Sequence, residues 1–74
     1  MKKAAPKTRV RNALRDLRLA ADEMTQQELA DQIGLTRQTV IAIEQARYSP
    51  SLEAAFRIAR ALGVPLERAF WLEE

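Results

Sequence analysis

The sequence predicts an all-α domain in which five short helices surround one core. Apolar residues recur at helical spacing, capping residues stand before several of these stretches, and glycine or proline separates them. A length of 74 residues allows a single domain, and 47% hydrophobic residues is ordinary for a folded protein. We therefore expect a flexible basic arm over residues 1–8 and one folded domain over residues 9–74.

The first predicted helix runs over about residues 9–20. Val10, Leu14 and Leu17 recur at three- and four-residue steps, which gives this stretch one apolar face. Charged residues fill many of the positions between them, so one side of this helix is expected to lie on the core.

Residues 26–45 are the centre of the prediction. Thr25 and Glu28 have the spacing of a capping box, in which each side chain satisfies a backbone amide of the other residue. Gly34 readily takes the left-handed backbone that ends a helix, and Thr36 can cap the helix that follows. Two short helices joined by such a turn form a helix-turn-helix. An antiparallel helix pair within another small helical domain is the alternative.

The second helix of this motif, over about residues 36–45, has distinct inner and outer faces. Val40 and Ile43 are the apolar residues at core spacing. The residues left on the outer face are Arg37, Gln38, Ile41, Ala42 and Gln45. This outer face is polar and cationic apart from its two apolar members.

Two further helices follow a loop over residues 46–50. Ser51 caps the fourth helix and Gly63 ends it, while Pro65 suits the first position of a short fifth helix that runs to about Phe70. The predicted inward stripe of the fourth helix consists of Leu52, Ala55, Phe56, Ala59 and Leu62.

Basic residues are concentrated at the amino-terminal end. Residues 1–18 contain seven lysines and arginines against one aspartate, whereas residues 19–74 contain five arginines against nine acids. This asymmetry suggests that the partner is an anionic polymer, and a solubilising tail is the alternative explanation.

Residue types that catalysis usually needs are missing. The chain has no histidine and no cysteine, so the common nucleophile–base pairs and the nitrogen or sulfur metal sites are absent. It also has no glycine-rich loop that could hold a nucleotide. We therefore expect no enzyme, no metal and no cofactor. No apolar run reaches the ~18–20 residues of a bilayer span, and no signal peptide is indicated, so a cytoplasmic location is expected.

Resemblance to a known family rests on two stretches, TQQELADQIGLTRQTVIAIEQ and ARYSPSLEAAFRIARALGVPLERAF. Both resemble the lambda-repressor-like helix-turn-helix regulators of the XRE, or Cro/C1, type, above all the shortest, single-domain members. The resemblance covers about residues 10–70. It implies a bacterial-type transcriptional regulator, with repression as the expected role, that associates with the nucleoid when bound to DNA. An antitoxin or another protein-interaction module of the same fold is the alternative, which Ile41 beside Ala42 supports.

Three features depart from the usual pattern of this family. Ala46 stands where a glycine commonly follows the second motif helix, which leaves room for a different loop backbone. The connection between Arg18 and Thr25 is one residue longer than usual. Ala42 stands where some phage repressors place a glutamine that contacts a base.

The resemblance implies that the second motif helix enters the major groove of double-stranded DNA. Arg37 and Gln38 are the expected base readers, because a guanidinium matches guanine and a glutamine amide matches adenine. A phosphate contact is the alternative for Arg37. The full set of expected base contacts is Arg37, Gln38, Ile41 and Ala42. The expected phosphate contacts are Gln26, Gln27, Thr36, Thr39, Gln45, Arg47 and Tyr48, joined by Lys2, Lys3, Lys7 and Arg9 of the basic arm.

A symmetric homodimer on a palindromic operator is the family solution, because one recognition helix reads only a few base pairs. Phe70, Trp71 and Leu72 are the expected dimer interface. Their alternation also permits a short extended C-terminal segment, paired with residues before the first helix. Closure of the monomer core is the alternative role for these residues.

Two residues at the far end of the recognition helix are expected to face the protein body. Glu44 would repel DNA unless it is paired, and Arg18 or Arg15 can pair with it as a recurring internal link of this family. An exposed glutamate at the groove margin is the alternative. Tyr48 is expected to lie partly in the core, with its hydroxyl facing the phosphates.

Overall fold

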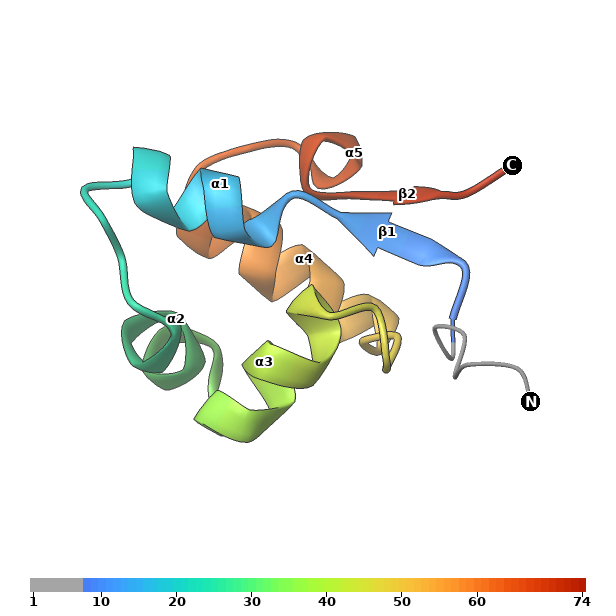
Figure 1. Cartoon of the computed structure of the whole chain (residues 1–74). Coiled ribbons are helices and arrows are strands. Elements are labelled where there is room, and N and C mark those ends of the chain that lie inside the picture. Colours follow the sequence, from blue (N-terminus) through green and yellow to red (C-terminus); the bar gives the residue numbers. More distant parts are fainter. Residues whose placement is uncertain (1–7) are drawn as a thin grey trace.

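The computed structural model describes residues 8–74, which form five helices and one two-stranded sheet. The helices gather around a common centre and the sheet lies at one end of the molecule (Figure 1). In chain order the elements are β1 (Val10–Asn12), α1 (Leu14–Ala20), α2 (Gln26–Ile33), α3 (Arg37–Glu44), α4 (Leu52–Leu62), α5 (Leu66–Ala69) and β2 (Phe70–Leu72). The predicted five-helix fold is thus confirmed.

The two strands join the beginning and the end of the described chain. They pair in an antiparallel register that matches Val10 with Leu72, Arg11 with Trp71 and Asn12 with Phe70. This pairing confirms the short extended C-terminal segment, paired with residues before the first helix, that the sequence permits. The predicted helix over residues 9–20 is wrong over residues 9–13, since α1 begins at Leu14. A single apolar residue four positions before a helix fits either structure, and Val10 packs against the core from a strand.

Helix α2 begins at the predicted capping box. The Thr25 hydroxyl accepts from the Glu28 amide at 2.9 Å, and the Glu28 carboxylate accepts from the Thr25 amide at 2.8 Å. Helix α2 ends at Gly34, whose φ of 76° is left-handed. The caps predicted for α3 and α4 are also present, at Thr36 and Ser51. Side-chain caps therefore define the start of each of these three helices.

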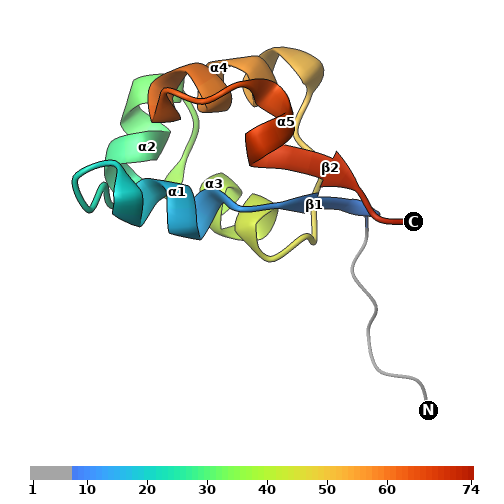
Figure 2. The same ribbon diagram turned by 90° about the horizontal axis from the view of Figure 1, so that it is seen from above.

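Helix α4 is rotated relative to its predicted orientation. Leu52 and Phe56 are 68% and 54% exposed, whereas Ile58 is completely buried. The buried stripe consists of Ala55, Ile58, Ala59 and Leu62, at the spacing of one helix face. With this stripe α4 packs on α2 and α5, and Figure 2 shows the three helices along one side of the molecule.

Helix α3 ends at an alanine with left-handed backbone. Ala46 has a φ of 58°. Its amide donates to the Ile43 carbonyl at 3.0 Å, and the Arg47 amide donates to the Ala42 carbonyl at 3.0 Å. These are the two bonds of a Schellman turn, which usually has glycine at the left-handed position. The alanine therefore keeps the turn that a glycine would make, contrary to the different backbone considered above.

Candidate nucleic-acid interface

Helix α3 lies at one margin of the molecule, with α2 beside it and β1 near its far end (Figure 1). Its rotation is fixed by Val40 and Ile43, which are 0% and 1% exposed in the core. Arg37 and Gln38 are exposed on its first turn. The structure thus presents both predicted base readers to solvent from a helix whose opposite side is anchored.

The other predicted contact residues lie on α3, at the start of α2 and in the loop after α3. Those exposed to solvent are Gln27, Thr36, Gln45, Arg47 and Tyr48. Those partly buried are Gln26, Thr39, Ile41 and Ala42. The start of α2 lies beside the start of α3, because Gln26, Gln27 and Arg37 line one hollow, and the loop follows α3 directly.

Two predictions differ from the structure or fall outside it. Tyr48 is 49% exposed, so more of its ring lies in solvent than expected for a residue partly in the core. Arg9 is exposed immediately before β1. Lys2, Lys3 and Lys7 lie outside the described residues.

Some of the predicted phosphate contacts have partners within the protein. Gln27 Nε2 donates to Asp31 Oδ1 at 2.9 Å, and an Arg47 guanidinium nitrogen donates to Gln45 Oε1 at 3.0 Å. Both bonds are exposed. Because exposed polar pairs contribute little, contact with a charged ligand can replace them at small cost.

Glu44, the one acid of α3, is turned into the protein. Arg18, itself 7% exposed, donates from Nε to Glu44 Oε2 at 2.6 Å and from a second nitrogen to Oε1 at 3.1 Å. The remaining guanidinium nitrogen donates to the Met24 carbonyl at 2.9 Å, and Gln26 Nε2 donates to Glu44 Oε1 at 3.1 Å. Of the two partners named from the sequence, Arg18 is the one in contact. The outer face of α3 is left without a negative charge.

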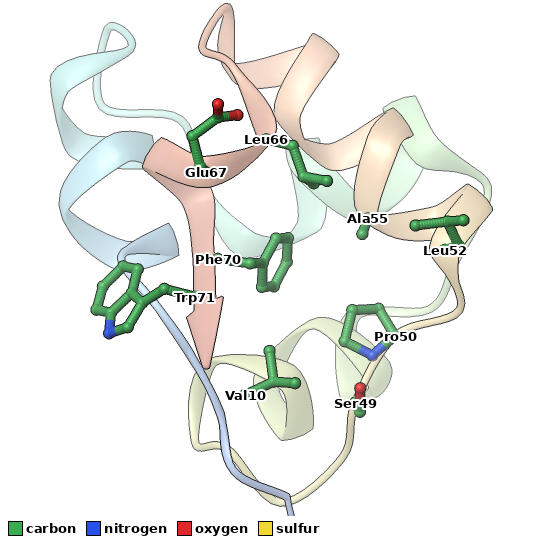
Figure 3. Close-up of a pocket in the computed structure, with 9 residues that line it drawn as sticks. All are labelled: Val10, Ser49, Pro50, Leu52, Ala55, Leu66, Glu67, Phe70 and Trp71. Atoms are coloured by element: carbon green, nitrogen blue, oxygen red, sulfur yellow. The ribbon is translucent and has the colours of Figure 1, made fainter. Parts of the chain in front are cut away.

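The three residues expected at a dimer interface differ in exposure. Phe70 is 8% exposed and belongs to the core, whereas Trp71 and Leu72 are 48% and 65% exposed. Beside them lies an apolar groove of about 400 Å³, lined by residues from β1, the loop before α4, α4, α5 and β2. In Figure 3 the ring of Trp71 lies on the opposite side of β2 from Phe70, at the edge of this groove. Phe70 therefore closes the monomer core, while Trp71 lines the rim of an open apolar surface.

The apolar surface extends further than the sequence pattern indicates. Leu52 lines this groove and a second hollow that also contains Phe56, so the apolar surface continues along α4. The spacing of both residues predicts a place in the core, which their exposure contradicts. Their exposure depends on which of two overlapping stripes of α4 faces inward, and hydrophobicity alone does not separate the two.

Within residues 8–74, no helix has the length and apolar character that crossing a membrane requires. Over the same range, no cluster of acidic side chains is arranged to hold a metal ion.

The helix-turn-helix family matches residues 14–68, which include the core helices and all of α3. The chain belongs to this family, in its Cro/C1 (XRE) type. Members of the family are DNA-binding transcriptional regulators and are typically not enzymes. The match therefore identifies this chain as a helix-turn-helix transcriptional regulator.

Individual relatives support this family assignment. An uncharacterized HTH-type transcriptional regulator of Methanothermobacter thermautotrophicus is 60% identical over 52 residues, covering 69% of this chain and 75% of that protein. The cryptic phage CTXphi transcriptional repressor RstR of Vibrio cholerae is 40% identical over 53 residues, covering 72% and 47%. Among solved structures, the restriction-modification controller protein C.AhdI of Aeromonas hydrophila has a TM-score of 0.68 at 33% identity, covering 74% and 82%.

Proposed function

We propose that this helix-turn-helix regulator is a repressor that reads the major groove of double-stranded DNA with α3. The observation that carries the proposal is the outer face of α3, where Arg37 and Gln38 are exposed while Glu44 is paired inside the protein. An eight-residue helix with donors on its first turn fits a groove about 12 Å wide. Similarity to the repressor RstR supports repression, which binding over a promoter achieves by occlusion.

In this proposal the base readers are the two residues on the first turn of α3. Arg37 donates two hydrogen bonds to guanine, and Gln38 pairs with adenine, each good bidentate contact contributing about 1–3 kcal/mol of discrimination. Ile41 and Ala42 contact thymine methyl groups, because neither side chain has a donor or an acceptor. Readout by this helix is therefore concentrated at its amino end.

Contacts with phosphates orient the protein without reading sequence. The start of α2 presents backbone amides and a favourable helix dipole, with Gln26 and Gln27 beside them. At the far end of α3, Gln45, Arg47 and Tyr48 lie where the second flank of the groove would pass. Gln26 contributes its remaining amide hydrogen, because Nε2 already donates once to the Glu44 carboxylate.

Two copies of the chain place two recognition helices on one palindromic operator, with half-sites about 34–36 Å apart. The proposed contact between subunits includes Trp71 and Leu72 of β2 and the apolar surface that runs to Leu52 and Phe56 of α4. Exposed apolar patches of this kind are rare on stable monomers and typical of interaction sites.

The first experiment selects the operator from random duplexes and then compares variants on it. Arg37→Ala and Gln38→Ala should relax the preference at particular base pairs, with each lost contact lowering discrimination by about 1–3 kcal/mol. Arg15→Ala, which removes an exposed arginine from α1, is the control for charge alone. Equal loss of specific and non-specific binding in the α3 variants would contradict the assignment of base readers.

Replacing Lys2, Lys3 and Lys7 with alanine tests the proposed role of the arm. Binding to all sequences should weaken together, and the dependence of affinity on salt should become less steep, because fewer counterions are released. An unchanged salt slope would mean that the arm does not contact phosphates.

Sedimentation equilibrium tests the dimer. Trp71→Ala and Phe56→Ser should each lower the dimer fraction, since both remove apolar surface from the proposed contact. A wild-type protein that remains monomeric at high concentration would rule the dimer out.

A protein-interaction module, such as an antitoxin, is the second candidate function. The apolar pair Ile41 and Ala42 on the outer face of α3 favours it, because such groups suit a protein surface as well as thymine. Gel shifts with genomic fragments at several salt concentrations separate the two candidates, since a module that binds only protein shows no preferred fragment.

A further inference from the structure

Asn12 hydrogen-bonds to two separate elements. Its side-chain oxygen accepts from the backbone amide of Leu14 at 3.1 Å, which satisfies an amide at the start of α1. Its side-chain nitrogen donates to the backbone carbonyl of Ile43 at 2.9 Å, across 31 positions of sequence. Both bonds are partly buried. Asn12 therefore connects β1 to α1 and to α3 at once.

The bond to Ile43 reaches the last turn of α3. Carbonyls in the last turn of a helix have no partner within the helix, so they accept from other groups. The Ile43 carbonyl accepts both from Asn12 and from the Ala46 amide, which is part of the turn that ends α3. Figures 1 and 2 agree that β1 passes this end of the helix. Asn12 thus holds the carboxyl end of α3 to the sheet.

A second polar link holds α3 from a different side. Glu44 is bound by Arg18 of α1 and by Gln26 of α2, whereas Asn12 belongs to β1. The apolar contacts of Val40 fix which side of α3 faces the core, but apolar contact is not directional. Hydrogen bonds constrain distance and angle. The two links together therefore restrict how far α3 can pivot.

We infer that Asn12 is a positioning residue for DNA binding, which sets the angle of α3 relative to the sheet. This inference rests on the proposed function, because it assigns to Asn12 control over how Arg37 and Gln38 meet the bases. A binding constellation must be held to about 0.5 Å and 10–20° to work, which apolar packing alone does not guarantee. Because Trp71 of β2 belongs to the proposed subunit contact, Asn12 also ties each recognition helix to that contact.

The two bonds of Asn12 can be separated by substitution. Asn12→Asp and Asn12→Ser both keep a side-chain oxygen that can accept from the Leu14 amide. Neither can donate to the Ile43 carbonyl, since a carboxylate has no donor and a serine is too short. Ile58→Val is the matched control, because it weakens the core within α4 without removing a polar link to α3.

The experiment compares affinity for the selected operator with affinity for the same duplex carrying one altered base pair, well below the unfolding temperature. Loss of one hydrogen bond should lower this discrimination about five- to tenfold in both Asn12 variants. Affinity for unrelated DNA should stay within about twofold, since phosphate contacts carry it. Ile58→Val should leave the discrimination unchanged. If Asn12→Asp fails to fold, Asn12→Ser gives the same comparison without a new charge.

Hydrogen exchange provides a readout that needs no DNA. The amides of Ala46 and Arg47 belong to the turn after α3, and their protection should fall at least about fivefold in the Asn12 variants. Folded variants with wild-type discrimination overturn the inference, even if their melting temperatures are lower. If the wild-type protein binds all duplexes equally, the proposed function is overturned. In that case the hydrogen exchange of the Asn12 variants still tests the link, and unchanged exchange at Ala46 and Arg47 would show that Asn12 does not hold α3.

Discussion

The buried pair of Arg18 and Glu44 leads to the sharpest prediction about stability. Their side chains are each 9% exposed, so both charges are largely removed from water and depend on one another. Arg18→Met keeps most of the side-chain volume but leaves the Glu44 carboxylate buried, with Gln26 as its remaining donor. Breaking a buried pair in this way costs about 3–5 kcal/mol.

This loss is large compared with the stability that a domain of this size can have. A folded chain of 74 residues has a free energy of unfolding of about 4–11 kcal/mol. For such a domain each kcal/mol corresponds to about 4–8 °C in melting temperature, so Arg18→Met should lower it by at least 12 °C. Thermal unfolding followed by circular dichroism measures the change.

Two further variants show whether the buried charge is the cause. Arg18→Met combined with Glu44→Leu removes both charges, and its stability should return to within about 1 kcal/mol of the wild type. Arg57→Met is the control, because Arg57 pairs with Glu53 on the exposed side of α4 and such pairs contribute about 0.3–0.5 kcal/mol. A loss below 1 kcal/mol in Arg18→Met, or no recovery in the double variant, would refute the reasoning.

Two other predictions concern the backbone and the core. Ala46→Gly should raise the free energy of unfolding by about 1 kcal/mol, because left-handed backbone costs alanine about 1–2 kcal/mol and glycine almost nothing; equal or lower stability in chemical denaturation would contradict this. Ile58→Ala should cost about 2–5 kcal/mol, whereas Phe56→Ala should cost less than 1 kcal/mol in a monomer. A larger loss for Phe56 at all protein concentrations would mean that α4 has the orientation expected from the sequence.

The parts of the fold that local chemistry decides could be predicted. A hydroxyl at Thr25, Thr36 or Ser51 accepts from the amide three residues later, so neighbouring residues alone determine where the helix starts. Gly34 ends α2 for an equally local reason, because its backbone is left-handed. The motif over residues 26–45 follows from these features without reference to the rest of the chain.

The sequence permits the pairing of the two strands but does not require it, because their formation depends on a partner far away in the sequence. Val10 and Arg11 are extended since β2 supplies hydrogen-bond partners from the other end of the chain. The link from Asn12 to Ile43 has the same character. An asparagine before a helix can cap it through its side-chain oxygen, as Asn12 does at the start of α1. Only the folded chain brings the Ile43 carbonyl within reach of the side-chain nitrogen of Asn12.

The contrast between α3 and α4 explains why the exposed face of α3 could be predicted while part of the core could not. In α3 the large apolar residues at core spacing are Val40 and Ile43, so the outer face follows by elimination. Helix α4 reads LEAAFRIARAL, and its alanines fit either against the core or in solvent, so they do not determine the rotation. The choice lies between stripes containing Phe56 and Ile58, and the packing of α4 on α2 and α5 selects Ile58.

This rotation has a consequence for association. It leaves Leu52 and Phe56 exposed next to the groove beside Trp71, and exposing them in a monomer loses the free energy that burial would provide. Fully burying a side chain of this size contributes about 1.5–3 kcal/mol, so covering several of them in both subunits can offset the entropy lost on association. Leu52 and Phe56, which the sequence pattern wrongly places in the core of the monomer, therefore belong to a surface whose burial favours the proposed dimer.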